Sequence, residues 1–256
     1  MAIEHIAIIG AGQMGNGIAQ VSSCAGYKVT MIDIKQEFVD KGMSTIEKSL
    51  AKLVSKEKIS EDEARSALSR ISISTDNSSA SDADLVIEAI VENLKIKSKV
   101  FAQLEQIAPK GCLLASNTSS LSIASIGSVL EDPSKMIGIH FFNPAPLMPL
   151  VEIIPAVQTS DETIKQVRAL IDSWKKTTVM CKDTPGFIVN RVARPFYGEA
   201  LRIYEEGVAD FATIDWAMTT IGGFKMGPFT LMDYIGNDVN YTVTETVFTA
   251  FYFDPR

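Results

Sequence analysis

Histidine and cysteine are scarce in this chain of 256 residues, which contains two histidines and three cysteines. Cys24, Cys112 and Cys181 are isolated from one another, odd in number and flanked by apolar sequence. This usage favours buried, reduced thiols over a disulfide framework. No segment has the spacing of a metal-binding motif, so we expect neither a disulfide framework nor a bound metal.

Long apolar runs and basic clusters are missing as well. No apolar stretch approaches the length of a membrane span, and the chain enters a strand pattern without a signal or transit segment. Lysine and arginine form no run, and the net charge is −7, which argues against nucleic-acid binding. We therefore expect a cytoplasmic protein that contacts neither membrane nor nucleic acid. Its length, with 46% hydrophobic residues, suffices for one large domain or two smaller ones.

What the sequence does contain, at its start, is a glycine motif that follows a short apolar run. Residues 6–9 lead into Gly10, Gly12 and Gly15 in the pattern GxGxxG, and a helical pattern follows. In such a motif the first glycine permits a tight turn, the second lets a pyrophosphate approach, and the third lets the helix pack close to the sheet. The N–H groups at the start of the helix then face the phosphates.

An acidic residue, Asp33, ends the second apolar run at about the distance of 20 residues that dinucleotide-binding folds use. A carboxylate there accepts hydrogen bonds from the adenosine ribose and repels a 2′-phosphate, which favours NAD over NADP. Lys35 is close enough to weaken this discrimination. The motif and the acid together predict a dinucleotide-binding βαβ unit; the alternative is a glycine-rich turn that binds no nucleotide.

Apolar periodicity predicts alternating strands and helices first and helices alone afterwards. Beyond the first βαβ unit, strands are expected at residues 71–74, 85–87, 112–115, 136–139, 150–154 and 177–180, and helices at 36–54, 60–68, 93–107 and 161–174. Pro185 and Gly186 break the pattern, and helices are expected at 188–206, 212–221 and 229–251. We therefore predict an α/β fold: a Rossmann-type, doubly wound, mostly parallel sheet over residues 1–183 and a smaller all-helical domain over 184–256.

His140 stands at the end of an expected strand, where an open α/β sheet has its ligand crevice. Histidine titrates close to neutral pH, so a histidine in this place is suited to act as a general base. Glu152, on an expected neighbouring strand, would bond the other ring nitrogen and stabilise the imidazolium that forms. The alternative is a hydrogen-bonded histidine of the core; His5 needs no special role.

Two further polar sites lie where apolar segments end. Residues 116–120 (SNTSS) would contact a nicotinamide ribose and a substrate oxygen, or simply cap the helix expected after Leu121. Asn190 follows the break at Pro185 and Gly186, where its amide would hold a substrate carbonyl or lie at the surface.

Together these segments resemble the 3-hydroxyacyl-CoA dehydrogenases, particularly the bacterial 3-hydroxybutyryl-CoA dehydrogenases, over essentially the whole chain. The resemblance is carried by GAGQMG at 10–15, EAIVEN at 88–93, ASNTSS at 115–120, HFFNP at 140–144, DTPGFIVNR at 183–191 and MGPF at 226–229. It implies reversible NAD-linked oxidation of an (S)-3-hydroxyacyl-CoA, such as 3-hydroxybutyryl-CoA, to the 3-oxoacyl-CoA. Acyl chain length and pathway, whether fatty-acid oxidation or butyrate-type synthesis, stay open.

The resemblance also implies roles for single residues. His140 matches the catalytic base and Glu152 its partner, while Ser119 and Asn190 match residues that position the substrate oxygens. The implied NAD contacts are Gly10, Gly12, Gln13, Met14, Gly15, Asp33, Glu92, Lys97, Ser119 and Asn143.

Contacts with the CoA substrate are implied for Ser49, Lys56 and Ser119. Lys48, Lys52 and Lys58 add positive charge to this stretch, which suits a phosphate-rich ligand. The alternative is a solvated helix face on which Glu47 and Glu57 balance the lysines.

In this family the helical domain closes over the substrate and forms a dimer, so we expect a homodimer. The apolar residues that would supply its surface are Phe229, Leu231, Met232, Tyr234 and Ile235. Two departures stand out: Pro149 replaces a common lysine, and the chain ends short of the family's lysine- and glycine-containing tail. Two other readings of function stay open: a dehydrogenase of free hydroxy or sugar acids of the gulonate type, and a catalytically silent NAD-binding relative such as a lens crystallin.

Overall fold

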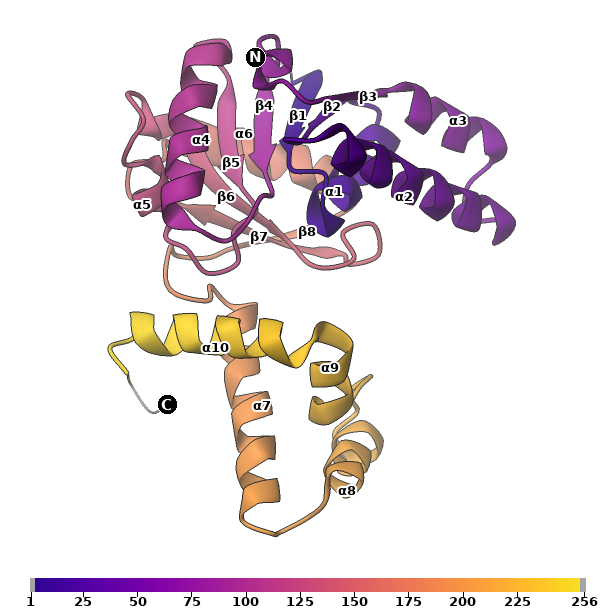
Figure 1. Ribbon diagram of the computed structural model, residues 1–256, viewed down its shortest axis with the longest axis vertical. Helices are drawn as coiled ribbons and strands as arrows, with labels where there is room; N and C mark the ends of the chain where they lie inside the picture. The colour runs from indigo at the N-terminus through magenta and orange to yellow at the C-terminus, as the bar shows by residue number, and fades with distance from the viewer. Residues whose placement is uncertain (1–2, 254–256) are drawn as a thin grey trace. The chain divides into compact units, whose positions relative to one another are not determined.

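The computed structural model describes residues 3–253 and divides into two compact units, residues 1–183 and 184–256 (Figure 1). The first unit contains all eight strands of the described chain in one sheet, and the second contains helices alone. Among the described residues, no helix has both the length and the apolar character needed to cross a bilayer.

The sheet has the order β3-β2-β1-β4-β5-β6-β7-β8, and β6 pairs antiparallel with β7 while all other pairs are parallel. The strands are β1 (His5–Ile9), β2 (Lys28–Ile32), β3 (Ile71–Ser74), β4 (Leu85–Glu88), β5 (Leu113–Ser116), β6 (Met136–Phe141), β7 (Leu150–Pro155) and β8 (Thr177–Met180). The strand order reverses between β1 and β4, and a doubly wound sheet binds its ligand at such a switch point. The prediction of a mostly parallel, Rossmann-like sheet is confirmed.

Six helices flank this sheet, with α4 in front of it and α6 behind it in Figure 1. They are α1 (Gln13–Cys24), α2 (Gln36–Ser55), α3 (Glu61–Ser69), α4 (Leu94–Ile107), α5 (Ile123–Gly127) and α6 (Asp161–Ser173). Polar side chains cap four of their starts: Ser60, Asn93, Ser122 and Ser160 each accept a hydrogen bond from a first-turn N–H group. The cap of α5 is thus Ser122, and the idea that residues 116–120 cap this helix was wrong.

The core of the first unit is built from the central strands and the inward faces of the helices. Every residue of β1, β4, β5 and β6 is buried, which explains why these strands are almost continuously apolar in the sequence. The polar exceptions therefore stand out, and most of them lie at the carboxyl ends of strands.

The second unit consists of α7 (Val189–Glu205), α8 (Phe211–Trp216), a π-helical turn (Ala217–Ile221), α9 (Pro228–Ile235) and α10 (Asn237–Ala250). The single helix expected at 229–251 is two helices, because Gly236 between them adopts φ +97°, which L side chains rarely adopt. The helix expected at 212–221 is α8 followed by the π-helical turn. At the start of α9, the carboxylate of Asp215 accepts hydrogen bonds from the N–H groups of Phe229 (2.9 Å) and Thr230 (2.8 Å).

The three cysteines are free thiols, but they are not all buried as expected. Cys24 is exposed because it occupies the last position of α1, where the helix leaves the core. Burial raises the pKa of Cys112 and of Cys181 to about 12. These two thiols are therefore protonated and unreactive near neutral pH.

Candidate active site

The predicted nucleotide loop joins the end of β1 to the start of α1. Gly10 has φ +105°, and a Cβ at this position would lie 2.6 Å from the carbonyl oxygen of Ala89. A Cβ on Gly12 would meet nothing within 4 Å, so this side of the loop is open, whereas one on Gly15 would collide with the Gly10 carbonyl. The loop thus combines tight packing beneath with an open face above, which a pyrophosphate requires.

The start of α1 also fits an anion. Gly12 precedes the helix, and no side chain caps the N–H groups of its first turn. Gln13 is exposed and Met14 half-buried, so the backbone here lies close to the surface. Uncapped N–H groups and the positive end of the helix dipole suit the pyrophosphate of a dinucleotide.

Asp33 follows β2 and fastens the loop from the neighbouring strand. Its Oδ2 accepts a hydrogen bond from the N–H of Ala11 (2.7 Å), and its Oδ1 accepts one from the N–H of Ile34 (2.7 Å). The carboxylate remains partly exposed beside the loop. This position fits the predicted role as a ribose acceptor and adds a second role, holding the shape of the loop.

His140 and Glu152 face each other across β6 and β7. The antiparallel register pairs these two residues directly, and the His140 Nδ1 to Glu152 Oε2 distance is 2.6 Å. Both side chains are buried, and the ring of Phe142 packs against the imidazole at a centroid distance of 4.6 Å. An ionised carboxylate only accepts hydrogen bonds, so Nδ1 is the donor in this bond to Glu152, and Nε2 is the second ring nitrogen.

Glu88, to which the sequence analysis gave no role, ties three elements together beneath the site. Its side chain is fully buried at the end of β4. One carboxylate oxygen accepts hydrogen bonds from the N–H of Ile90 (2.7 Å) and from Nζ of Lys97 on α4 (2.6 Å). The other accepts one from Oγ of Ser116 at the end of β5 (2.7 Å). A glutamate ending the otherwise apolar strand LVIE was the signal that could have revealed it.

Lys97 also pairs with Glu92, which in turn bonds the loop after β5. Nζ of Lys97 lies 3.3 Å from Oε2 of Glu92, and Oε1 of Glu92 accepts hydrogen bonds from Oγ1 of Thr118 (2.5 Å) and the N–H of Ser119 (3.0 Å). Burial alone would raise the pKa of Glu92, but the Lys97 ammonium and these hydrogen bonds outweigh it and lower the pKa below its usual value. Lys97 itself is 1% exposed, so its ammonium faces two carboxylates and not the surface.

Asn117 links the loop after β5 to the strand that bears His140. Its Oδ1 accepts a hydrogen bond from the N–H of Phe141 at the end of β6 (2.8 Å). Asn143 follows two residues later and is exposed. The first unit therefore gathers the predicted Ser119, Glu92, Lys97, His140 and Glu152 along the carboxyl ends of β4, β5 and β6, together with Glu88 and Asn117.

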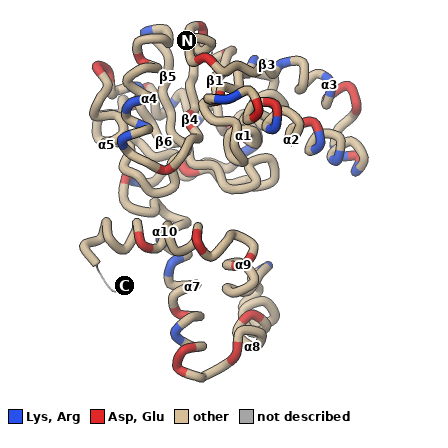
Figure 2. The backbone as a smooth tube through the Cα atoms, viewed as in Figure 1, with Lys and Arg blue, Asp and Glu red and all other residues tan. Residues whose placement is uncertain are grey.

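The other predicted residues lie elsewhere. Asn190 belongs to α7 in the second unit, where its carbonyl accepts a hydrogen bond from Nε of Arg194 (3.0 Å). Ser49 is half-buried on α2, and Lys56 is exposed at the end of that helix. Figure 2 shows acidic and basic positions interspersed along α2. Lys48, Lys52 and Lys56 follow one another at a spacing of four residues, which is typical of neighbours on one face of a helix. Pro149 directly precedes β7 and is exposed.

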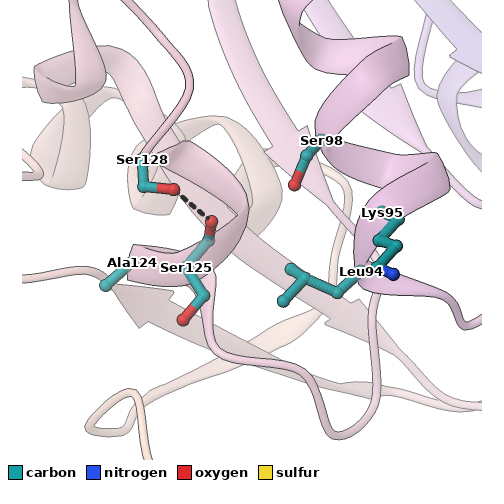
Figure 3. Close-up of a pocket in the computed structure, with 6 residues that line it drawn as sticks. All are labelled: Leu94, Lys95, Ser98, Ala124, Ser125 and Ser128. Carbon is teal, nitrogen blue, oxygen red and sulfur yellow. Dashed lines mark hydrogen bonds between the residues drawn. The ribbon is translucent and has the colours of Figure 1, made fainter.

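A hollow of about 710 Å³ between α4 and α5 contains none of the predicted site residues. It is lined by Leu94, Lys95, Ser98, Ala124, Ser125 and Ser128. In Figure 3, Leu94 extends from α4 toward α5, and the hydroxyl of Ser128 bonds the carbonyl of Ser125 (2.7 Å). It offers no buried titratable group, so we place the chemistry at the sheet edge instead.

The fold and the glycine loop define a dinucleotide-binding α/β protein. Comparison with protein families makes this more specific. The family model for the 3-hydroxyacyl-CoA dehydrogenase NAD binding domain matches residues 5–184, and that for the C-terminal domain of the same enzymes matches residues 186–256. The chain belongs to the 3-hydroxyacyl-CoA dehydrogenase family.

Individual relatives agree with this assignment. The chain is 44% identical to the 3-hydroxyadipyl-CoA dehydrogenase of Escherichia coli over 99% of its length, but it spans only 54% of that protein. It is 46% identical to a probable 3-hydroxybutyryl-CoA dehydrogenase of Deinococcus radiodurans, with 94% of this chain and 86% of the relative covered. The crystal structure of (S)-3-hydroxybutyryl-CoA dehydrogenase from Ralstonia eutropha superposes with a TM-score of 0.95 at 42% identity, covering 99% and 89% of the two chains.

The buried pair of Glu88 and Lys97 generates a stability prediction. We expect Lys97→Met to lower the free energy of unfolding by about 3–5 kcal/mol, because it leaves the Glu88 carboxylate buried without a cation. Adding Glu88→Gln should restore most of the loss, since the fully buried charge is then gone and the partly exposed Glu92 keeps its hydrogen bonds from Thr118 and Ser119. Urea unfolding followed by circular dichroism measures both, with Lys99→Met, at an exposed position of α4, as the control. A double variant no more stable than Lys97→Met would contradict the prediction.

Proposed function

We propose that this protein is an NAD-dependent dehydrogenase that interconverts (S)-3-hydroxyacyl-CoA and 3-oxoacyl-CoA, with 3-hydroxybutyryl-CoA and acetoacetyl-CoA as the substrate pair. The observation that carries the proposal is the buried pair of His140 and Glu152 on the same sheet as the open glycine loop. The names of the relatives support it, since two of the three described above are 3-hydroxybutyryl-CoA dehydrogenases.

In the proposed mechanism, His140 accepts the proton of the substrate hydroxyl at Nε2 during oxidation. Glu152, bonded to Nδ1, fixes the orientation of the ring and stabilises the imidazolium. Bound NAD supplies the hydride acceptor. In the reverse direction the imidazolium of His140 returns the proton to the carbonyl oxygen of the substrate.

The remaining residues bind and orient in this proposal. The first turn of α1, with Gln13 and Met14, holds the pyrophosphate of NAD, and Asp33 holds the ribose. Glu92, Lys97, Ser119 and Asn143 are kept as further NAD contacts. Ser119 and Asn190 position the substrate oxygens, and Ser49 and Lys56 contact the CoA. Lys97 and Glu92 bond each other as well, so a nucleotide would have to share or replace their present contacts.

We also propose that the protein is a homodimer formed by its helical unit. This unit carries a groove of about 870 Å³ whose lining includes Phe211, Phe229 and Tyr241. Phe211 and Tyr241 are exposed, as are Tyr234 and Ile235 of the expected set, and such apolar surface is typical of an interface. Met232, also expected at this surface, is buried, because it lies on the inner face of α9.

The activity is tested by the initial rate of NADH oxidation with acetoacetyl-CoA. We expect turnover that requires the CoA thioester and is slower with NADPH; turnover of free acetoacetate instead would favour a dehydrogenase of free acids.

His140→Gln should lower kcat by about 10²–10⁴-fold while NADH still binds, because only proton transfer is lost. Near-normal turnover of this variant would exclude His140 as the base. If the wild-type protein binds NADH but turns over neither substrate, it would instead be a catalytically silent relative.

Asp33→Ala should weaken NADH binding by about tenfold and narrow the gap between NADH and NADPH, because the ribose acceptor and its charge are removed. Fluorescence titration with each cofactor gives the two dissociation constants. Asp40→Ala, at an exposed position of α2, is the control. An unchanged ratio of the two constants would show that Asp33 does not read the ribose.

For the dimer, light scattering should give twice the mass of the 27.9 kDa chain. Tyr241→Asp should shift the protein to monomers, because it replaces an exposed aromatic ring of this groove by a charge that an interface would have to desolvate. Thr249→Asp, at another exposed position of α10, should leave the dimer intact. A wild-type protein that stays monomeric at assay concentration would refute the proposal.

A further inference from the structure

The loop of residues 142–149 joins the two strands that carry the catalytic pair. It begins two residues after His140 and ends three residues before Glu152, and it includes the predicted NAD contact Asn143. Within the loop, the N–H groups of Leu147 and Met148 both donate to the carbonyl of Pro144 (3.0 Å each). The loop is therefore a closed turn and not an extended connection.

The loop packs against the helix of the nucleotide loop. Ala145 is buried, and a Cβ placed on Gly17 of α1 would lie 3.2 Å from Cβ of Ala145 and 3.3 Å from Cδ of Pro146. A side chain at position 17 would push the loop away. The loop thus contacts α1, whose first turn is the proposed pyrophosphate site.

Lys176, between α6 and β8, also bonds this loop. Its ammonium donates hydrogen bonds to the carbonyl of Ala145 (2.7 Å) and to the carbonyl of Met148 (2.8 Å). Within residues 3–253, no carboxylate lies within ion-pair distance of this ammonium, so its partners are backbone dipoles alone. Partial burial accordingly lowers the pKa of Lys176 below its ordinary value. The half-buried ammonium of Lys176 thus makes both of its hydrogen bonds to carbonyl groups of one loop, and such an arrangement indicates a role in holding that loop in place.

The same segment touches the catalytic strand at a second point. Trp174, two residues before Lys176, stacks on the ring of Phe141 at a centroid distance of 6.1 Å. Phe141 directly follows His140 in the chain. The N–H of Thr177, one residue after Lys176, donates to the carbonyl of Pro149 at the end of the loop (2.8 Å). Three successive contacts from one short segment therefore fix both ends of the connection between His140 and Glu152.

We propose that Lys176 is a positioning residue for the dehydrogenase reaction, which clamps residues 142–149 so that His140, Asn143 and the start of α1 keep their relative places. The inference rests on the proposed function for its catalytic part. The clamp itself is a property of the unliganded protein. The two parts are therefore tested by separate measurements.

The clamp is tested by hydrogen exchange of the unliganded protein. Lys176→Met removes the ammonium but keeps most of the apolar stem, and we expect amides of residues 142–149 to exchange about tenfold faster or more, because their opening becomes easier. Lys176→Arg, which retains the charge and donors, should restore most of the protection. Lys165→Met, at an exposed position of α6, should leave exchange unchanged. Unchanged exchange in Lys176→Met overturns the proposal; Lys176→Gln replaces this variant if it does not fold.

The catalytic part is tested by the kinetics of acetoacetyl-CoA reduction with the same variants. Lys176→Met should lower kcat by about tenfold, because small displacements of reacting groups are costly, and leave KM for acetoacetyl-CoA within about twofold. A merely structural role would lower the amount of active enzyme but leave kcat per correctly folded active site unchanged. Faster exchange with unchanged kcat overturns the positioning role. A wild-type protein without turnover refutes the proposed function instead, and the exchange result alone then decides whether the clamp exists.

Discussion

The buried contact between Glu88 and Lys97 is the constraint on which the arrangement of the first unit's site depends. Taking both charges out of water costs free energy that their attraction barely recovers, so the pair is weak evidence for stability. What it fixes is geometry. The two oxygens of Glu88 bind β5, α4 and the turn after β4 at once, and Lys97 extends the network to Glu92. Removing Lys97 would leave the Glu88 carboxylate buried without a cation, and removing Glu88 would leave Lys97 with Glu92 as its one carboxylate partner, so the network depends on both charges.

The arrangement of strands could be predicted because buried parallel strands must be short apolar runs, and polar or glycine-rich segments separate them. The helical unit was harder. Apolar residues continue on both sides of Gly236, so the sequence pattern alone does not reveal a break there. The break results from the positive φ of Gly236, and a glycine within a helical pattern is only a weak signal that the helix ends. The π-helical turn after α8 leaves no signal in the apolar pattern either.

For the site, position at a strand end predicted His140, and an acid on the neighbouring strand predicted Glu152 as its partner. The antiparallel register of β6 and β7 places the two side chains opposite each other. Lys97 was predicted as a nucleotide contact, yet it is buried. Its neighbours Lys95 and Lys99 point to solvent, and a lysine alone does not say which way it turns. The spacing along the helix does indicate the direction, because Lys97 shares the i, i+4, i+7 pattern with Phe101 and Leu104, which lie in the core. A lysine in an apolar stripe requires a buried partner, and Glu88 and Glu92 are the acids within its reach.

Two lysines of the first unit, Lys97 and Lys176, thus have different partners and different burial. Lys97 is compensated by carboxylates and can be fully buried, whereas Lys176 has only carbonyl dipoles and must keep part of its side chain near water. Lys97 on α4 is accordingly fully buried, and Lys176 is half-buried where it bonds the loop between His140 and Glu152. The sheet register sets the distance between the histidine and its carboxylate, while these two cations fix the segments on either side of it. In the proposed mechanism His140 must keep one orientation through proton transfer, which requires both the register and the fixed segments.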